Sequence, residues 1–490
     1  MTSVFIFMVI INWLIEANIR KRIDKFWADP SLIIYSVAYL VYIIWMLNTS
    51  DLNYGLHALK LKIPLIFLPA VIGTSDKLGR IERKIILSTL ILGLLIATIA
   101  GSAYSIFNSS ELIDRRELSL FISHIRLSLM ICFGIFIAGY YYTEGIDRSK
   151  YLRACYLISG LWLTVFLFIM FSFTGIVIFG ILLIYLVVRF SVRLSKVLRI
   201  AGLTLTITVA SLIIVYIIYQ VKDYSKLREP DIIEEGIKTL NGNEYTHDPG
   251  RKDVENGYYV WRYICDEELR PEWNKISDID YDGIDRRGHQ LRNTLIRYLT
   301  SIGSRKDSAG LSKLDKDDID IIESGYANII YRDGTGIRDK IYETIWQIDY
   351  YLDGGNPQGH SITQKLDFLI TGWRVFLAHP LFGTGTGDMV NEILMQYDRD
   401  GSNLDQEFRR MPHNQYLTVL TSFGIIGFIL FWGAVLIPIF IRERTGNLLF
   451  SVFLIIILLS MIGEDTLETH TGVTFFSCYY GIFMFSNGKS

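Results

Sequence analysis

The residue best suited to chemistry lies at the start of an apolar run near the carboxyl end of the chain. The segment 409–417 reads R-R-M-P-H-N-Q-Y-L, so His413 immediately precedes a stretch long enough to cross a membrane. An imidazole at the mouth of such a span titrates near neutral pH and can accept a proton from a hydroxyl group. The same histidine could instead only cap the helix, and Asn414 stands at the same helix start.

Cations accompany this histidine. Arg409 and Arg410 stand just upstream, and a guanidinium fork suits the oxygens of a phosphate. The alternative for both is a solvated pair of external charges. Arg126 lies inside another apolar run, close to His124. An arginine inside a membrane is costly, so a function or a buried partner is expected unless its side chain reaches the interface.

A glycine-rich turn precedes the histidine segment. Gly383 and Gly385 belong to the sequence P-L-F-G-T-G-T-G at 380–387, whose amides could approach an anion closely. The turn is not a nucleotide-binding loop, because no G-K-[ST] sequence follows it. An ordinary turn without a ligand is the alternative.

The last external loop, 463–470, is short and acidic. Glu464 or Glu468 in this loop could orient His413 or pair with one of the arginines. The alternative is that the loop merely lacks positive charge, as external loops do.

One segment resembles a calcium loop without completing it. Asp278, Asp280, Asp282 and Gly283 match its beginning, but the twelfth position is His289 instead of a bidentate glutamate. A solvated acidic turn is the better interpretation. The sequence also contains no H-E-x-x-H and no C-x-x-C motif. We expect neither a metal nor another cofactor.

Membrane-spanning helices must position these residues. The chain has 490 residues, of which 51% are hydrophobic and 20% charged, and the apolar residues gather into long runs. About 20 apolar residues cross the hydrocarbon core of a bilayer. A net charge of −2 argues against a general nucleic-acid binder. We therefore predict an all-α polytopic membrane protein with eleven or twelve transmembrane helices. The runs that we assign as spans are 3–16, 31–47, 63–73, 85–103, 121–142, 154–170, 175–188, 200–219, 414–440, 447–462 and 471–486.

The distribution of lysine and arginine predicts the orientation of these spans. Eighteen basic residues fall in one set of alternate loops and four in the other, where Lys60, Lys62, Arg115 and Arg116 stand. Short cytoplasmic loops carry the excess of positive charge. The bias therefore places the carboxyl terminus in the cytoplasm and the long polar region outside.

The chain should have three parts. They are a bundle of about eight spans at 1–219, a large external domain at 220–412 and a bundle of about three spans at 413–490. Apolar periodicity predicts helices at 291–302 and 337–351, so the external domain should be mostly helical. The stretch 366–377 is amphipathic and suits the membrane surface.

Three motifs follow one another late in the chain. P-L-F-G-T-G-T-G at 380–387 is followed by H-N-Q-Y-L at 413–417 and G-I-I-G at 424–427. Together they resemble the O-antigen ligase and O-antigen polymerase superfamily, and the segment 461–476 is similar to that family's last external loop and span. The likeness extends over the whole topology, with its motifs concentrated between about 360 and 480.

The resemblance implies a metal-independent, inverting glycosyl transfer at the periplasmic face of the cell inner (cytoplasmic) membrane. A glycan on undecaprenyl pyrophosphate would move to an acceptor hydroxyl. His413 would assist that hydroxyl, and basic groups would neutralise the departing pyrophosphate. The lipid pyrophosphate is already an activated leaving group, so no nucleotide is required.

The sequence departs from the family pattern at two places. The family usually has an arginine where this chain has Lys365, which keeps the charge but loses the bidentate fork, so Arg374 or Arg410 would share its work. The family's S-R-G is here part of 172–175, S-F-T-G, and Arg126 is our substitute for the missing arginine. The predicted site comprises His413, Lys365 and Arg374 as catalytic residues, Arg126, Arg409, Arg410, Gly383 and Gly385 as pyrophosphate-binding residues, and Asn414, Glu464 and Glu468 as supporting residues.

The motifs do not distinguish among three acceptors. A ligase, our first hypothesis, joins the glycan to a lipid A-core sugar; a polymerase uses another lipid-linked repeat unit; a protein O-oligosaccharyltransferase uses serine or threonine. A transporter of lipid-linked glycans is the alternative from another class. It is disfavoured because the distinctive polar motifs gather at one membrane face and not at the midplane.

Overall fold

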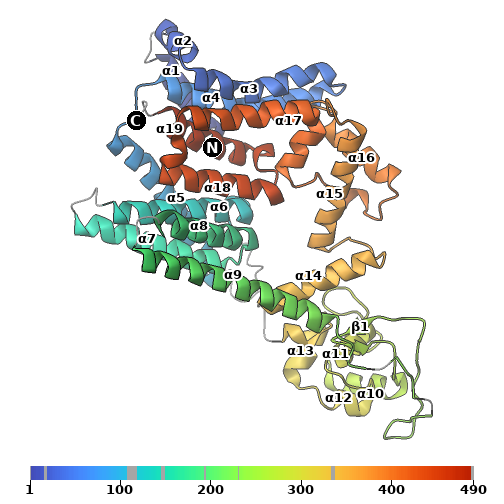
Figure 1. Cartoon of the computed structure of the whole chain (residues 1–490). Helices are drawn as coiled ribbons and strands as arrows, with labels where there is room; N and C mark the ends of the chain where they lie inside the picture. The colour runs from blue at the N-terminus through green and yellow to red at the C-terminus, as the bar shows by residue number, and fades with distance from the viewer. Residues whose placement is uncertain are drawn as a thin grey trace. The chain divides into compact units, whose positions relative to one another are not determined.

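Almost all of the regular secondary structure is helical, which confirms the predicted fold class (Figure 1). Two short strands, β1 (Val254–Glu255) and β2 (Tyr258–Tyr259), form a hairpin. The computed structural model describes residues 2–15, 19–107, 118–144, 149–191, 195–229, 231–234, 236–332 and 337–486.

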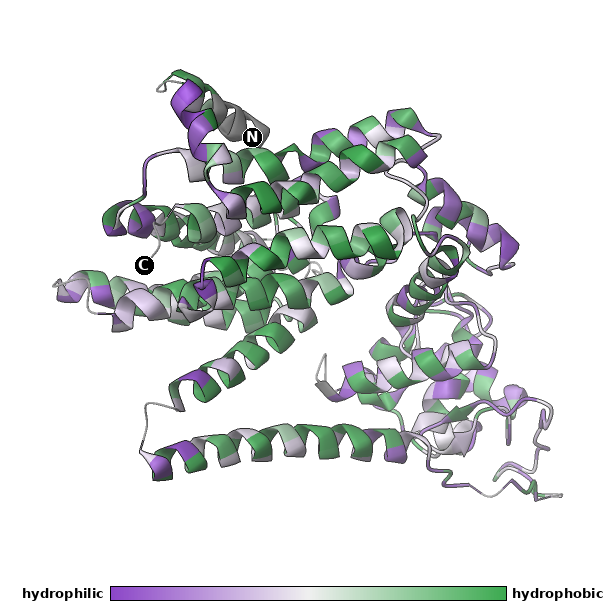
Figure 2. Cartoon of the chain, turned by 45° about the horizontal axis from the view of Figure 1, so that its top comes forward, coloured by the Kyte–Doolittle hydropathy of each residue, from purple (hydrophilic) through white to green (hydrophobic). Residues whose placement is uncertain are grey.

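Each of the eleven predicted spans coincides with a helix. They are α1 (Thr2–Ile15), α3 (Pro30–Ile44), α4 (Leu52–Thr74), α5 (Arg80–Phe107), α6 (His124–Thr143), α7 (Lys150–Ile169), α8 (Phe173–Ser191), α9 (Lys196–Tyr224), α17 (Gln415–Ile441), α18 (Leu448–Gly463) and α19 (His470–Phe485). By length and composition, eight of the described helices can cross a membrane; α1, α18 and α19, with 14, 16 and 16 residues, are shorter. Figure 2 shows hydrophobic residues along these helices and hydrophilic ones mainly near their ends. The chain is a multi-pass membrane protein.

Helix α4 is longer than the sequence suggested. The prediction placed a span at 63–73 and left Lys60 and Lys62 in an external loop, whereas the helix begins at Leu52 and includes both lysines. Asp51 caps it by accepting from the backbone N–H of Tyr54 at 3.0 Å. The first half of α4 contains polar residues, among them His57, Lys60 and Lys62, so hydropathy detects only the apolar second half.

The contacts divide the chain into two units. Unit 1 comprises Met1–Arg199 and Pro357–Ser490, and unit 2 comprises Ile200–Asn356. Residues 357–412 are therefore grouped with the helical bundle. The predicted boundaries at residues 219 and 412 separate membrane-spanning parts from an external domain, and they stay predictions.

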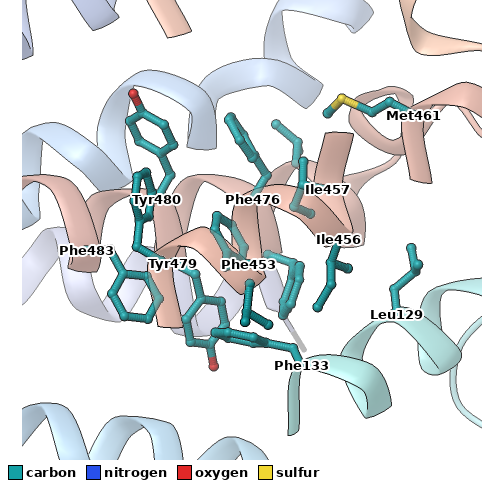
Figure 3. Close-up of a cluster of buried hydrophobic side chains, with 14 of the residues drawn as sticks. Leu129, Phe133, Phe453, Ile456, Ile457, Met461, Phe476, Tyr479, Tyr480 and Phe483 are labelled. Atoms are coloured by element: carbon teal, nitrogen blue, oxygen red, sulfur yellow. The ribbon is translucent and has the colours of Figure 1, made fainter. Parts of the chain in front are cut away.

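Aromatic side chains fill the core of unit 1 where α6, α18 and α19 meet (Figure 3). The ring of Phe133 lies 5.5 Å from that of Phe453 and 5.3 Å from that of Tyr479. Inside a bilayer, lipid tails are as apolar as these side chains, so close van der Waals packing holds the helices together. Offset and edge-to-face ring pairs add about 0.5–1.5 kcal/mol each.

Unit 2 contains its own core. Its remaining helices are α10 (Asp266–Ile276), α11 (Leu291–Ser301), α12 (Ser308–Leu311), α13 (Lys316–Glu323), η3 (Ile329–Tyr331) and α14 (Ile337–Leu352). The fully buried Trp273, Tyr281 and Leu295 belong to this core. Helices α11 and α14 confirm the two helices predicted from periodicity.

Candidate functional site

The candidate site lies where α15 (Ser361–Ala378) meets the start of α17 and the loop between α18 and α19. All three belong to unit 1. The amphipathic stretch predicted at 366–377 is part of α15.

His413 occupies the turn that leads into α17. Its φ angle of 49° is left-handed, a conformation that non-glycine residues seldom adopt and that recurs at functional sites. Its ring centroid lies 5.7 Å from that of Phe368 on α15. Partial burial lowers the pKa of His413, and the positive charges of Lys365 and Arg410 lower it further, while the charge of Glu464 raises it. The net effect keeps the imidazole neutral near neutral pH, so it can accept a proton.

Lys365 and Glu464 form an ion pair beside this histidine. The distance from Lys365 Nζ to Glu464 Oε1 is 3.6 Å, and the lysine side chain is 45% exposed. A pair this exposed contributes little stability. Its importance is electrostatic, since both charges act on His413.

Arg374 makes a separate contact. Its Nη1 lies 2.8 Å from Asp400 Oδ1, just beyond the end of α16 (Met389–Arg399). Arg374 is nine residues from Lys365 on α15, so about 100° per residue places the two on opposite faces of the helix. The structure does not bring Arg374 to His413.

The two neighbouring arginines differ in their surroundings. Arg409 is only 10% exposed, donates to Asp398 Oδ1 at 2.5 Å and to the carbonyl of Leu404 at 3.0 Å, and lies over the ring of Tyr397. It holds the turn together. Arg410 is exposed and acts on the pKa of His413.

The glycine-rich turn has a structural task that the sequence did not suggest. The backbone N–H of Gly383 donates to the carbonyl of His379 at 3.0 Å, and that of Gly385 to the carbonyl of Ser422 at 2.8 Å. The turn packs against α17 where that helix is interrupted at Gly424, whose φ is 62° and ψ −172°. A Cβ on Gly385 would lie 2.1 Å from the carbonyl oxygen of Asn48. These amides serve the protein itself, so the glycines permit close backbone packing.

Asn414 is the N-cap of α17. Its side-chain oxygen accepts from the backbone N–H of Leu417 at 2.9 Å, and its amide nitrogen donates to the carbonyl of Ile462 at 2.9 Å. It therefore fixes the turn that carries His413 and ties it to the end of α18.

Glu468 pairs with a lysine that the sequence interpretation did not select. Lys62 on α4 is fully buried; its Nζ lies 2.7 Å from Glu468 Oε1 and donates to the carbonyl of Leu467 at 2.5 Å. The side chain of Gln415 donates to Glu468 at 2.9 Å and accepts from the N–H of Leu467 at 2.7 Å. The sequence feature that could have identified Lys62 is its position beside an apolar run.

The loop between α18 and α19 is thus fastened by three carboxylates. Glu464 pairs with Lys365, Glu468 with Lys62, and Asp465 accepts from Thr418 on α17 at 2.7 Å. Burial raises the pKa of Asp465 to about 6, and this hydrogen bond partly opposes the increase. The loop joins α4, α15 and α17 around the turn of His413.

Arg126 is half-buried in the first turn of α6. Within the described ranges, no hydrogen bond or ion pair connects it to His413 or to the last loop. Its predicted role as a phosphate contact stays a prediction.

No group of three or more metal-ligating side chains occurs among the described residues. In the segment that resembles a calcium loop, Asp282 pairs with Arg270 at 2.8 Å and Asp280 accepts from Asn274 at 3.0 Å. These carboxylates have protein partners.

Comparison with known proteins gives a match over part of the chain. Residues 321–432 match the family model described as O-antigen ligase. No curated protein matches the chain. The matched segment contains His413, Lys365, Arg374 and the glycine-rich turn, whereas Lys62 and the loop between α18 and α19 lie outside it. Residues 321–432 are thus similar to the O-antigen ligase family, which confirms the resemblance predicted from the motifs.

Proposed function

We propose that the protein is a membrane glycosyltransferase that moves a glycan from undecaprenyl pyrophosphate to an acceptor hydroxyl at the periplasmic face of the inner membrane. The observation that carries the proposal is the state of His413. It is held in a fixed turn, with its pKa lowered by burial and by two cations, inside a segment similar to O-antigen ligases.

The chemistry follows from these surroundings. The acceptor oxygen attacks the anomeric carbon, a ring nitrogen of His413 takes the hydroxyl proton, and the bond between that carbon and the pyrophosphate oxygen breaks. The electron pair leaves with the lipid pyrophosphate, so attack from the opposite side inverts the anomeric centre. Lys365 and Arg410 are exposed enough to meet the departing charge. Arg409, which is engaged by Asp398, would act only by shaping the turn.

Our first choice of acceptor is a sugar of the lipid A-core, which makes the protein an O-antigen ligase. Polymerisation on a second lipid-linked unit and transfer to protein hydroxyls use the same chemistry. Deletion of the gene tests this choice of acceptor. Gel electrophoresis and mass spectrometry would compare three glycan pools: surface glycans, undecaprenyl-linked glycans and glycoproteins. A ligase predicts loss of long glycans from lipid A, with long chains retained on undecaprenyl.

The other outcomes are distinct. Surface glycans shortened to one repeat unit would indicate a polymerase, and selective loss of glycoproteins would indicate an oligosaccharyltransferase. If all three pools were unchanged, the proposed glycosyl transfer would be rejected.

A further inference from the structure

Unit 2 contains a groove that the proposed chemistry does not use. A hollow of about 590 Å³ lies among the end of α9, the β1–β2 hairpin, α11 and α14. A second hollow of about 290 Å³ adjoins it. Arg251, Trp261 and Arg297 line both, so the two hollows are compartments of one feature, which we call the unit 2 groove. The larger compartment has the size typical of ligand sites, about 300–1,000 Å³.

Aromatic rings form the walls of the groove. Trp346 and Tyr350 stand four residues apart on α14 and therefore share one face of the helix. Their rings stack with centroids 5.4 Å apart and an interplanar angle of 9°. Arg251 and Trp261 line both compartments, and we call this pair the Arg251–Trp261 ridge. The guanidinium of Arg251 lies 3.7 Å from the ring centre of Trp261.

The buried carboxylate of Glu255 fixes one polar group of the groove, the guanidinium of Arg297. Glu255 accepts from Arg297 Nε at 2.7 Å and from Asn328 and Tyr342, each at 2.8 Å. Arg297 in turn lies 5.4 Å from the ring centre of Trp346. The guanidinium of Arg297 is therefore held in place beside the Trp346 wall before any ligand arrives, which reduces the entropy cost of binding.

The charges of the larger compartment balance. It is lined by four basic and four acidic side chains: Lys226, Arg251, Lys252, Arg297, Asp253, Glu255, Asp349 and Asp353. A groove for nucleic acid or for a phosphate-rich ligand would carry an excess of positive charge. Balanced charge, planar hydrogen-bonding groups and flat apolar rings suit a neutral ligand rich in hydroxyl groups.

We propose that the unit 2 groove, built on the Trp346–Tyr350 stack and the Arg251–Trp261 ridge, binds a neutral oligosaccharide. The C–H face of a sugar ring packs on an aromatic wall, and its hydroxyls bond with the carboxylates, amides and guanidinium groups around it. The two compartments would hold successive sugars of one chain. The assignment of this oligosaccharide to the donor glycan or to the acceptor glycan rests on the proposed function.

Binding to the full-length protein in detergent tests the inference. The background is His413→Ala, in which the proposed transfer is stopped, so that only binding is measured. The probes are two fluorescently labelled oligosaccharides, one released by mild acid from the cell's polyprenyl-linked pool and one from its surface lipid. Fluorescence anisotropy with each probe distinguishes the donor from the acceptor glycan.

The groove variant is the double substitution Trp346→Ala and Tyr350→Ala. The matched control is Tyr151→Ala on α7, where the tyrosine is 85% exposed. Loss of both rings should weaken binding of one probe about tenfold, while the control binds like the parent protein. Tyr350→Ala alone, at a 39% exposed side chain, and Asp353→Asn serve if the double variant fails to fold. Each should weaken the same probe.

Unchanged binding in all groove variants, or no binding of either probe to the parent, would overturn the proposal. Neither result bears on glycosyl transfer, which is measured separately in protein with His413 intact. Groove-dependent binding without any transfer would instead reject the proposed function and leave the groove proposal standing.

Discussion

The protonation state of His413 is the feature on which the proposed chemistry depends. A general base must be neutral when the acceptor arrives, and partial burial favours the neutral form. Lys365 and Arg410 act in the same direction, and Glu464 opposes them. The Lys365–Glu464 pair therefore sets the proton affinity of the histidine from both sides.

This arrangement predicts opposite pH shifts for two variants. The acid limb of the kcat/KM profile should lie below the ordinary histidine pKa of about 6.5, because the pKa of His413 in the free protein is lowered. Lys365→Met removes a positive charge, raises this pKa and should move the limb to higher pH. Glu464→Gln removes a negative charge and should move it to lower pH. Shifts in the same direction would show that a different group titrates.

The ion pair between the buried Lys62 and the partly exposed Glu468 gives a stability prediction. Lys62→Met should lower the free energy of unfolding by roughly 3 kcal/mol, because it leaves Glu468 without its cation; the carboxylate is 30% exposed, which favours the low end of the usual range. Adding Glu468→Gln should restore the stability to within about 1 kcal/mol, since a neutral pair needs no counter-charge. Thermal unfolding midpoints in detergent measure both. A double variant as unstable as the single one would contradict this account.

At the scale of elements, the glycine-rich turn joins η1 (Trp45–Asn48) to the interruption in α17. Trp45 Nε1 donates to the carbonyl of Phe382 at 2.5 Å, and the N–H of Thr384 donates to the carbonyl of Thr421 at 3.0 Å. The close approach of these backbones leaves no room for a side chain at Gly383 or Gly385.

A matched pair of glycine variants tests this packing. Gly385 has a φ of 100° and its added Cβ would strike Asn48, so Gly385→Ala should destabilise the protein by roughly 3–4 kcal/mol. Gly401 also has a positive φ, 61°, but nothing lies within 4 Å of its added Cβ. Gly401→Ala should therefore cost only about 1 kcal/mol. Equal shifts in the unfolding midpoint would mean that position 385 tolerates a side chain.

The elements were more predictable than their contacts. Each of the eleven apolar runs coincides with a described helix, because hydropathy records what faces lipid or core. The first half of α4 was missed because its polar residues did not extend the apolar run. The β1–β2 hairpin was missed too, although Asn256-Gly257, with φ angles of 49° and 89°, is a strong two-residue turn signal.

The site was only partly predictable for a related reason. Local sequence indicated that His413 and Asn414 begin a helix, and the cap contact is present. The pairs Lys365–Glu464 and Lys62–Glu468 join residues far apart in the chain, so spacing alone could not reveal them. The internal partners of the glycine turn's amides were not predictable, because a turn rich in free amides and one whose amides are used internally have the same sequence.

For the whole molecule, the two units suggest a division of labour. Unit 1 holds the histidine turn among membrane helices, and unit 2 holds the aromatic groove. On our proposals, bond exchange belongs to the first unit and recognition of the sugar chain to the second. Groove variants should then alter the choice of glycan, and variants around His413 the rate of transfer.

The most direct test of the central claim is glycosyl transfer by the purified protein in liposomes. The donor is the undecaprenyl-linked glycan and the acceptor is lipid purified from the deletion strain. His413→Ala should lower the rate by about 10²–10⁴-fold, as expected for loss of a general base. His57→Ala, at an exposed histidine on α4, should transfer at the wild-type rate. Wild-type transfer by the His413→Ala protein would contradict the proposed mechanism.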